Sequence, residues 1–186
     1  YAPEQTLDPI TCADGMQQVI SSLLCESLFR LGPDFQPQAW LCERYTCEGN
    51  KYTLTLRDGV TFSDGSPLTA KDVKATLDRA RNSQRYGARL SGVTRISSGS
   101  GTVTITLSSP NSAFPALLDI PIVKAGTERG IPTGTGPYLF SAESTGDCLI
   151  ANQSWWQGAA QPIDRIALVE ASDQNTMLYR FTSHDV

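Results

Sequence analysis

Residues 51–81 of the chain read KYTLTLRDGVTFSDGSPLTAKDVKATLDRAR, and this stretch decides the fold. Its first part alternates between apolar and polar side chains, with Tyr52, Leu54 and Leu56 at every second position. A period of two predicts a strand with one buried face. The Asp-Gly pair that follows predicts a turn, because both residue types tolerate positive φ at low cost.

The segment after this turn leaves two alternatives open. A strict two-residue hairpin would direct Val60 and Phe62 to the face opposite Leu54 and Leu56. Either the connection is therefore longer than two residues, or both faces of the hairpin are covered.

A helix is predicted after a second turn, which has the sequence Asp-Gly-Ser-Pro. Thr69 is the expected N-cap, and Asp72 three residues later completes a shortened capping box. The apolar positions of the helix lie on one stripe, and they are Ala70, Val73, Leu77 and Ala80. The whole stretch thus predicts a packed β-β-α unit.

Length and composition exclude several classes of protein. The chain has 186 residues, 40% of them hydrophobic, enough for one large domain or two small ones. A net charge of -4 disfavours binding to nucleic acid or to an anionic membrane. No apolar run reaches the roughly 18 residues of a membrane span. The start of the chain carries neither an initiator Met nor a signal-peptide pattern, which indicates a trimmed or mature end.

Five cysteines are too few for a disulfide scaffold, and we expect most of them to be small buried hydrophobes. One disulfide remains possible. Cys42 and Cys47 are five residues apart and would point to opposite faces of a straight strand. They lack the second pair of ligands that a structural zinc site needs, and we expect neither a metal nor a cofactor.

No catalytic constellation is evident. A serine or cysteine nucleophile usually needs a histidine as its general base. His184 is the only histidine in the sequence, so we expect no catalytic residues. The glycine-rich stretch at residues 131–140, IPTGTGPYLF, lacks the GxxxxGK[ST] pattern, and the residues after it read as strand. A phosphate cradle is therefore disfavoured.

Several stretches resemble the signature blocks of one family. They are LDP at 7–9, LLCESLFRL at 23–31, the block at 52–80, IPTGTGPYLF at 131–140 and NQSWWQG at 152–158. All are similar to the family 5 extracellular solute-binding proteins, the oligopeptide, dipeptide and nickel receptors of ABC importers. The matches run from Leu7 to Val186 in the family's order. Family members are more than twice as long, so the chain resembles their N-terminal half.

The resemblance implies ligand-contacting residues near the start of the chain. In the family, the loop between the LDP motif and the first helix lies at the ligand cleft. That loop corresponds here to Ala13, Asp14, Gly15 and Met16. The helix after it is expected to run from Met16 to Phe29. An ordinary surface loop is the alternative.

Three aromatic residues complete the expected site. Tyr86 falls where the family often places an aromatic near the cleft, although a packed tyrosine is the alternative. Trp155 replaces a usual tyrosine and is a candidate wall of the cleft, although paired tryptophans also occur in cores. Tyr179, in a helix expected from Asp173 to about Phe181, falls where some peptide receptors contact ligand.

The resemblance implies a mixed α/β fold, periplasmic-binding-protein-like and of class II. The chain would be the N-terminal lobe with an inserted α+β subdomain, and the second lobe would be absent. Residues 1–31 and 122–186 would form lobe I around a discontinuous mixed sheet with helices. Residues 32–121 would form the inserted subdomain.

The function implied is capture of a solute for an ABC importer, most simply an oligopeptide or dipeptide held between two lobes. The alternatives are a ligand-sensing domain of a regulator and a receptor for nickel or another small solute. The implied partners are a small peptide or similar solute and the permease subunits, with no nucleic acid. The implied location is outside the cytoplasm, with membrane attachment only through a possible N-terminal lipid anchor.

Overall fold

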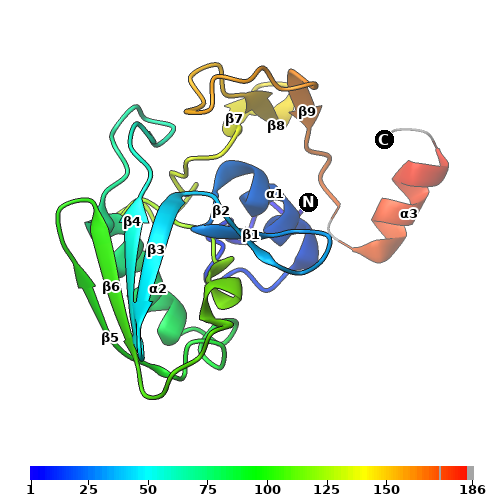
Figure 1. The fold of residues 1–186 in the computed structure, drawn as a ribbon. Helices are drawn as coiled ribbons and strands as arrows, with labels where there is room; N and C mark the ends of the chain where they lie inside the picture. The colour runs from blue at the N-terminus through cyan, green and yellow to red at the C-terminus, as the bar shows by residue number, and fades with distance from the viewer. Residues whose placement is uncertain (172, 184–186) are drawn as a thin grey trace.

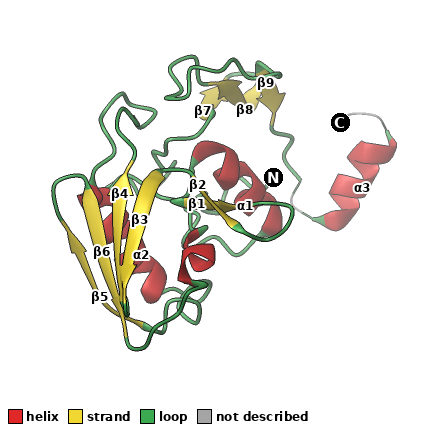
Figure 2. Cartoon of the chain, viewed as in Figure 1, coloured by secondary structure: helices red, strands yellow, loops and turns green. Residues whose placement is uncertain are grey.

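A computed structural model describes residues 1–171 and 173–183 (Figure 1). The helices lie among three antiparallel sheets (Figure 2). The elements in chain order are α1 (Gly15–Leu24), β1 (Phe29–Leu31), β2 (Pro37–Ala39), β3 (Cys42–Glu48), β4 (Lys51–Leu56), α2 (Ala70–Arg81), β5 (Val93–Ser98), β6 (Thr102–Leu107), the 3₁₀ helix η1 (Phe114–Leu118), β7 (Tyr138–Glu143), β8 (Gly146–Ala151), β9 (Arg165–Ala167) and α3 (Gln174–Thr182).

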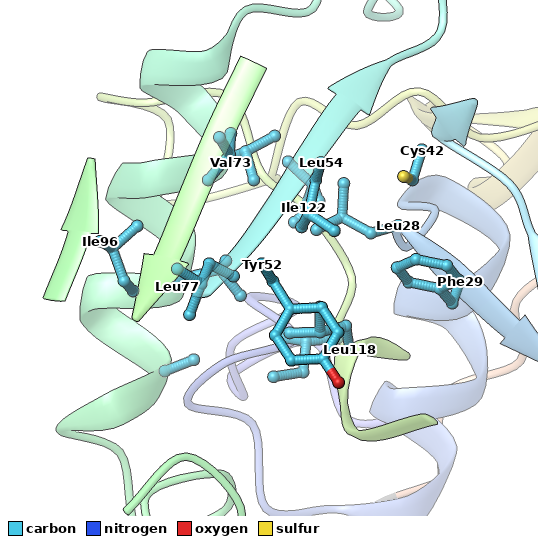
Figure 3. Packing of buried hydrophobic residues seen from close by; sticks show 14 of the residues in the cluster. Leu28, Phe29, Cys42, Tyr52, Leu54, Val73, Leu77, Ile96, Leu118 and Ile122 are labelled. Carbon is cyan, nitrogen blue, oxygen red and sulfur yellow. The ribbon is translucent and has the colours of Figure 1, made fainter. Parts of the chain in front are cut away.

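A four-stranded sheet in the order β3-β4-β6-β5 forms the largest layer. Its alternating apolar residues face α2, as the period of two and the helical stripe predict. Tyr52 and Leu54 of β4 pack in one cluster with Val73 and Leu77 of α2 (Figure 3). Thr69 caps α2 and forms the complete capping box with Asp72, as predicted. The β4–α2 arrangement therefore confirms the β and α parts of the expected unit.

The connection between β4 and α2 resolves the open alternatives. Val60 and Phe62 do not pair back to β4, whose two neighbours are β3 and β6. They pair forward instead, because the Phe62 amide donates to Ser66 O at 2.8 Å and the Leu68 amide donates to Val60 O at 3.0 Å. The connection is thus longer than two residues, and the expected second strand is reduced to one isolated bridge.

Helix α1 ends at Leu24, five residues earlier than predicted. Cys25 already has extended backbone, at φ -127° and ψ 135°. The carbonyls that would continue the helix accept bonds from distant segments: Leu24 O from the Gly136 amide at 2.9 Å, and Glu26 O from the Ile122 amide at 2.8 Å. Tertiary partners therefore replace the last turn, and the chain continues into β1.

The third sheet, β7-β8-β9, lies apart from the first and packs against α1. Every pairing among the described residues is antiparallel, so the mixed sheet expected for residues 1–31 and 122–186 is not formed by them. Residues 1–31 contribute β1, which pairs with β2, and Ser27, which forms an isolated antiparallel bridge with Pro121. Helix α3, capped by Asp173, matches its predicted position and projects to one side (Figure 1).

The buried side chains form two clusters. One surrounds α2 and the four-stranded sheet, and the other lies between α1 and β7–β8. Helix α2 also binds the crossing segment: the Thr76 hydroxyl donates to Val123 O at 3.0 Å and accepts from its amide at 3.1 Å. The first cluster also includes Ile10, Leu28, Phe29 and Ile122 from the expected lobe I, so the division at residues 31/32 and 121/122 stays a prediction.

All five cysteines are free. Four are buried, and Cys47 alone is exposed, so the expectation of small buried hydrophobes is confirmed for most of them. Cys42 and Cys47 both lie on β3, Cys42 buried and Cys47 exposed. A β-bulge between Cys42 and Arg44 shifts the register, so the two cysteines pair with Leu56 and Tyr52, which lie on one face of β4. The opposite faces expected for a straight strand are therefore not observed.

Candidate ligand-binding site

Two depressions flank the N-terminal end of α1. The first, here called the polar pocket, has a volume of about 520 Å³. It is lined by Ile10, Thr11, Cys12, Ala13, Gln18, Asn82, Ser83, Gln84 and Arg85. The second, here called the apolar pocket, has a volume of about 340 Å³ and lies between α1, β9 and α3. Its lining includes Met16, Val19, Leu23, Ile166, Leu168 and Met177.

Asp8 shapes one wall of the polar pocket. Its carboxylate is 2% exposed and accepts from the Thr11 hydroxyl at 2.8 Å, while the amides of Thr11 and Cys12 bond to its carbonyl at 3.1 and 2.9 Å. Arg79 of α2 forms an ion pair with the same carboxylate. The LDP motif is thus a tight turn held by a charge from α2, and this pair brings residues 10–13 next to residues 82–85.

The opposite wall is the turn that ends α2. Ser83 donates its hydroxyl proton to Ala80 O at 2.9 Å and accepts from the Tyr86 amide at 3.0 Å. Asn82 donates its side-chain amide to Asp78 O at 2.9 Å. These local bonds satisfy the carbonyls left open at the end of the helix. They also leave the next two side chains, Gln84 and Arg85, facing the pocket.

Cys12 contributes a thiol to the lining of the polar pocket. Burial raises the pKa of its thiol above the usual value, while a hydrogen bond to Ser21 and the charge of Arg85 act in the lowering direction. The carboxylates of Asp8 and Asp14 add to the increase. Cys12 is therefore a neutral thiol at physiological pH, a packing group rather than a nucleophile.

Of the four residues expected from the first loop, Ala13 and Met16 line different pockets, and Asp14 and Gly15 line neither of the two. Ala13 lines the polar pocket, and Met16, which is 48% exposed, lines the apolar one. Asp14 is the N-cap of α1, and its Oδ1 accepts from the amides of Met16 and Gln17 at 2.9 and 3.1 Å. Gly15 begins the helix. The Asp14 carboxylate therefore acts first as a cap.

Tyr86 does not present its ring to a ligand. It is 4% exposed and belongs to the core around α2, so the packed alternative describes it. Its ring is contacted by two guanidinium groups, Arg85 at 5.2 Å and Arg89 at 5.4 Å from the centroid. Tyr86 thus supports a pocket residue rather than lining the pocket itself.

Trp155 lies near the other end of α1, because its neighbour Trp156 contacts Glu26, two residues after the helix ends. Its ring packs edge-on against Trp156 at 6.1 Å. Trp156 in turn donates to the buried carboxylate of Glu26 at 2.6 Å. Tyr179, on α3, is 70% exposed and lines neither pocket. The expected site residues are thus not all brought together.

The glycine-rich stretch at 131–140 has a packing role. A Cβ on Gly134 would lie 2.1 Å from Leu24 O, and one on Gly136 would lie 2.3 Å from Leu23 O. Both glycines permit the close approach of this loop to the end of α1, where the Gly136 amide bonds to Leu24 O. This contact agrees with the rejection of a phosphate cradle.

Comparison with known proteins assigns the family. The family model for bacterial extracellular solute-binding proteins, family 5, matches residues 36–186. The chain belongs to this family. The glutathione-binding protein GsiB of Salmonella typhi is 34% identical over 189 residues, which cover 92% of this chain and 37% of that protein. This family 5 chain therefore spans well under half the length of the curated relative it matches.

Solved structures support the same fold. AgaA of A. tumefaciens R10, in complex with agropinic acid, is 26% identical with a TM-score of 0.80, covering 99% of this chain and 41% of that one. A nickel ABC transporter protein of Bacillus halodurans has a TM-score of 0.78 at 24% identity, covering 98% and 40%. These likenesses confirm a mixed α/β, periplasmic-binding-protein-like fold for this family 5 chain.

Metal-binding groups and membrane-spanning helices are not found in the described part of this family 5 chain. Within residues 1–171 and 173–183, no group of three or more His, Cys, Asp or Glu side chains could hold a metal ion. No described helix is both long and apolar enough to cross a membrane. His184, the sole histidine, lies outside the described residues. The family's description names its members extracellular solute-binding proteins, which agrees with a location outside the cytoplasm.

Two features of the site were missed from the sequence. The polar run at 82–85 reads only as a loop, and its role depends on Arg79 pairing with Asp8 71 positions away. The sequence places Glu26 inside the helix predicted from Met16 to Phe29. It is the one acid within the apolar run 23–29, and a lone acid in an apolar run is a signal for a buried, paired carboxylate.

Proposed function

We propose that this chain is part of the solute-capturing component of an ABC importer, and that its polar pocket holds part of a small peptide or peptide-like solute. The observation that carries the proposal is the pocket itself. It is hydrogen-bonding in character, it joins the first loop to the end of α2, and it lies in a chain of family 5. Ala13 of the expected cleft loop lies in its wall.

The relatives support a solute of this class. Glutathione, after which the glutathione-binding protein GsiB is named, is a tripeptide with free carboxylates. Agropinic acid, bound in the AgaA structure, is also an acid. Both solutes are small and rich in hydrogen-bonding groups. The lining of the polar pocket likewise consists mostly of residues with polar side chains. The volume of about 520 Å³ falls within the usual range of pockets for small solutes.

The pocket is open to solvent, and in a two-lobe receptor it would form only one side of the ligand cleft. In a two-lobe receptor, the ligand shifts the population toward a closed form because it contacts both lobes. A solute held by a single wall gains few contacts to offset its lost translational freedom, so binding to this wall alone would be weak. Under this proposal the remaining contacts come from sequence that the relatives carry beyond the matched region.

The partners follow from the same proposal. The permease subunits of an importer would receive the solute, and a lipid anchor at the N-terminus would hold the receptor at the membrane surface. No catalytic residue is needed, because capture requires differential binding and not bond breaking. A sensing domain of a regulator, or a nickel receptor such as the Bacillus halodurans relative suggests, remains the second candidate.

Calorimetric titration of the full natural protein tests the proposal. The probes are glutathione, a set of dipeptides and tripeptides, a neutral sugar and Ni²⁺. We expect binding to one or more peptides and no binding to the sugar. Substitution of Ala13 by Trp, which fills the polar pocket, should weaken that binding at least about tenfold. Binding of Ni²⁺ alone, unaffected by the substitution at Ala13, would contradict the proposal.

A further inference from the structure

The polar pocket contains a single charged residue in its lining, Arg85. The other lining residues are neutral. Most of the neutral polar side chains already have protein partners: the Thr11 hydroxyl binds Asp8, the Gln18 amide binds Ala13 O at 3.2 Å, and Asn82 and Ser83 bind the end of α2. The groups that remain open to a solute are those of Arg85 and its neighbour Gln84.

Arg85 differs from the neighbouring arginines along the chain. Arg79 pairs with Asp8, Arg81 lies 3.8 Å from Asp78, and Arg89 pairs with Asp119. Among the described residues, no carboxylate lies within ion-pair distance of Arg85. Its charge is therefore not neutralised by the part of the chain that the structure describes.

The guanidinium of Arg85 is nevertheless held in place. It lies 5.2 Å from the centroid of the Tyr86 ring, and that ring is fixed in the core with 4% exposure. On the same ring, Arg89 lies at 5.4 Å and is fixed by its pair with Asp119. A cation stacked on a buried aromatic ring loses less conformational entropy when it binds an anion.

The two acids nearest the pocket do not compete for Arg85. The Asp8 carboxylate is engaged by Arg79 and Thr11, and Asp14 caps the first turn of α1. An arginine with a free fork of donors, in a pocket without a free acid, fits a carboxylate in bidentate geometry.

We infer that Arg85 is a specificity-determining residue that binds a carboxylate group of the solute, with Tyr86 as the platform that orients it. This inference rests on the proposal that the polar pocket holds the solute, and it narrows the solute to the acids. The carboxylate comes from a peptide or from a non-peptide acid, and the two sources are separated by the choice of probes.

The test compares matched acidic and neutral probes on the full natural protein by calorimetric titration. The peptide pair is glutathione and its diethyl ester, which lacks both negative charges. The non-peptide probe is agropinic acid. The variants are Arg85→Gln, Arg85→Lys and the control Arg95→Gln, which removes the same charge from an exposed position on β5.

We expect the wild-type protein and the Arg95→Gln control to bind an acid about 10-fold to 100-fold more tightly than the ester, as for a charge-assisted hydrogen-bonded pair. Arg85→Gln should abolish this preference, and Arg85→Lys should restore only part of it, because lysine keeps the charge but not the fork. Unchanged melting temperatures would show that the variants are folded.

The other outcomes would contradict either the role of Arg85 or the peptide proposal. A preference for the acid that survives in Arg85→Gln overturns the inference, and so does the absence of binding to every acidic probe. Equal binding of glutathione and its ester leaves the peptide proposal standing and overturns the role of Arg85. Binding of agropinic acid that depends on Arg85, without binding of any peptide, supports Arg85 and overturns the peptide proposal.

Discussion

The indole Nε1 of Trp156 donates a 2.6 Å hydrogen bond to Oε2 of Glu26, whose side chain is completely buried. The same carboxylate accepts from Trp40 Nε1 at 2.8 Å, from the Thr135 hydroxyl at 3.0 Å and from Arg30 at 3.0 Å. Two of these donors, Thr135 and Trp156, come from segments more than 100 residues along the chain. This carboxylate joins the end of α1 to the glycine-rich loop and to the paired tryptophans.

Replacement of Glu26 by Gln is expected to lower the free energy of unfolding by about 2–4 kcal/mol, because an amide NH₂ would face two of the four donors. All three tryptophans lie in this cluster, at centroid distances of 5.9 and 6.1 Å, so their fluorescence should shift to longer wavelength. Urea unfolding followed by fluorescence measures both effects. Glu43→Gln, at an exposed position on β3, is the control, and equal stability of the two variants would refute the role of Glu26.

Gly136→Ala is expected to destabilise the protein by about 1–3 kcal/mol, since its Cβ would lie 2.3 Å from backbone carbonyl oxygen of Leu23. The matched control is Gly15→Ala, where a Cβ meets nothing within 4 Å and alanine favours the helix. Thermal unfolding by circular dichroism compares the two. A melting temperature for Gly136→Ala equal to that of the control would contradict the close-approach argument.

Thr76→Val tests the bond between α2 and the crossing segment. The change keeps the side-chain shape and removes both hydrogen bonds to Val123, leaving a buried amide and carbonyl without that partner. We expect a loss of about 1–3 kcal/mol. Thr46→Val, on the exposed face of β3, should change stability by less than about 0.5 kcal/mol. Chemical denaturation of both variants gives the comparison.

Asp64 gives the stability a defined acid dependence. Hydrogen bonds from Lys124 and then Ser66 lower the pKa of this carboxyl from 3.8 to about 2. Because the folded pKa lies below the unfolded one, the stabilisation is complete above about pH 4 and is lost as the pH falls toward 2. Asp64→Asn should flatten the pH dependence in this interval and leave the slope above pH 5 unchanged. Denaturation curves at several pH values measure the free energy of unfolding of both proteins. If the wild-type protein and Asp64→Asn lose stability equally between pH 4 and pH 2, the contact with Lys124 has no effect.

One thiol should react quickly with a disulfide reagent in the native state. Cys47 is the exposed cysteine, whereas burial raises the pKa of Cys42 to about 11 and that of Cys25 still further. An absorbance assay should count one fast thiol in the native protein and five after unfolding. Cys47→Ser should abolish the fast phase, and a fast phase that persists in this variant would show that a second thiol is accessible.

Local patterns were sufficient for the elements whose reasons are local. The alternation in 51–56 and the stripe and cap in 70–81 predicted β4 and α2, because side-chain period and capping depend on neighbours within a few residues. The signature stretches indicated the family, and with it the fold.

The tertiary structure alone decided what depends on partners far along the chain. Apolar periodicity continues through residues 25–29, but bonds from residues 122 and 136 end α1 at Leu24. Tyr86 is buried because α2 and the sheet enclose it, which no loop pattern shows. The polar pocket exists because Arg79 holds Asp8 and thereby joins two segments about 70 residues apart in sequence. Sequence patterns record which faces are apolar, whereas a site made by contacts between distant segments appears only when the chain has folded.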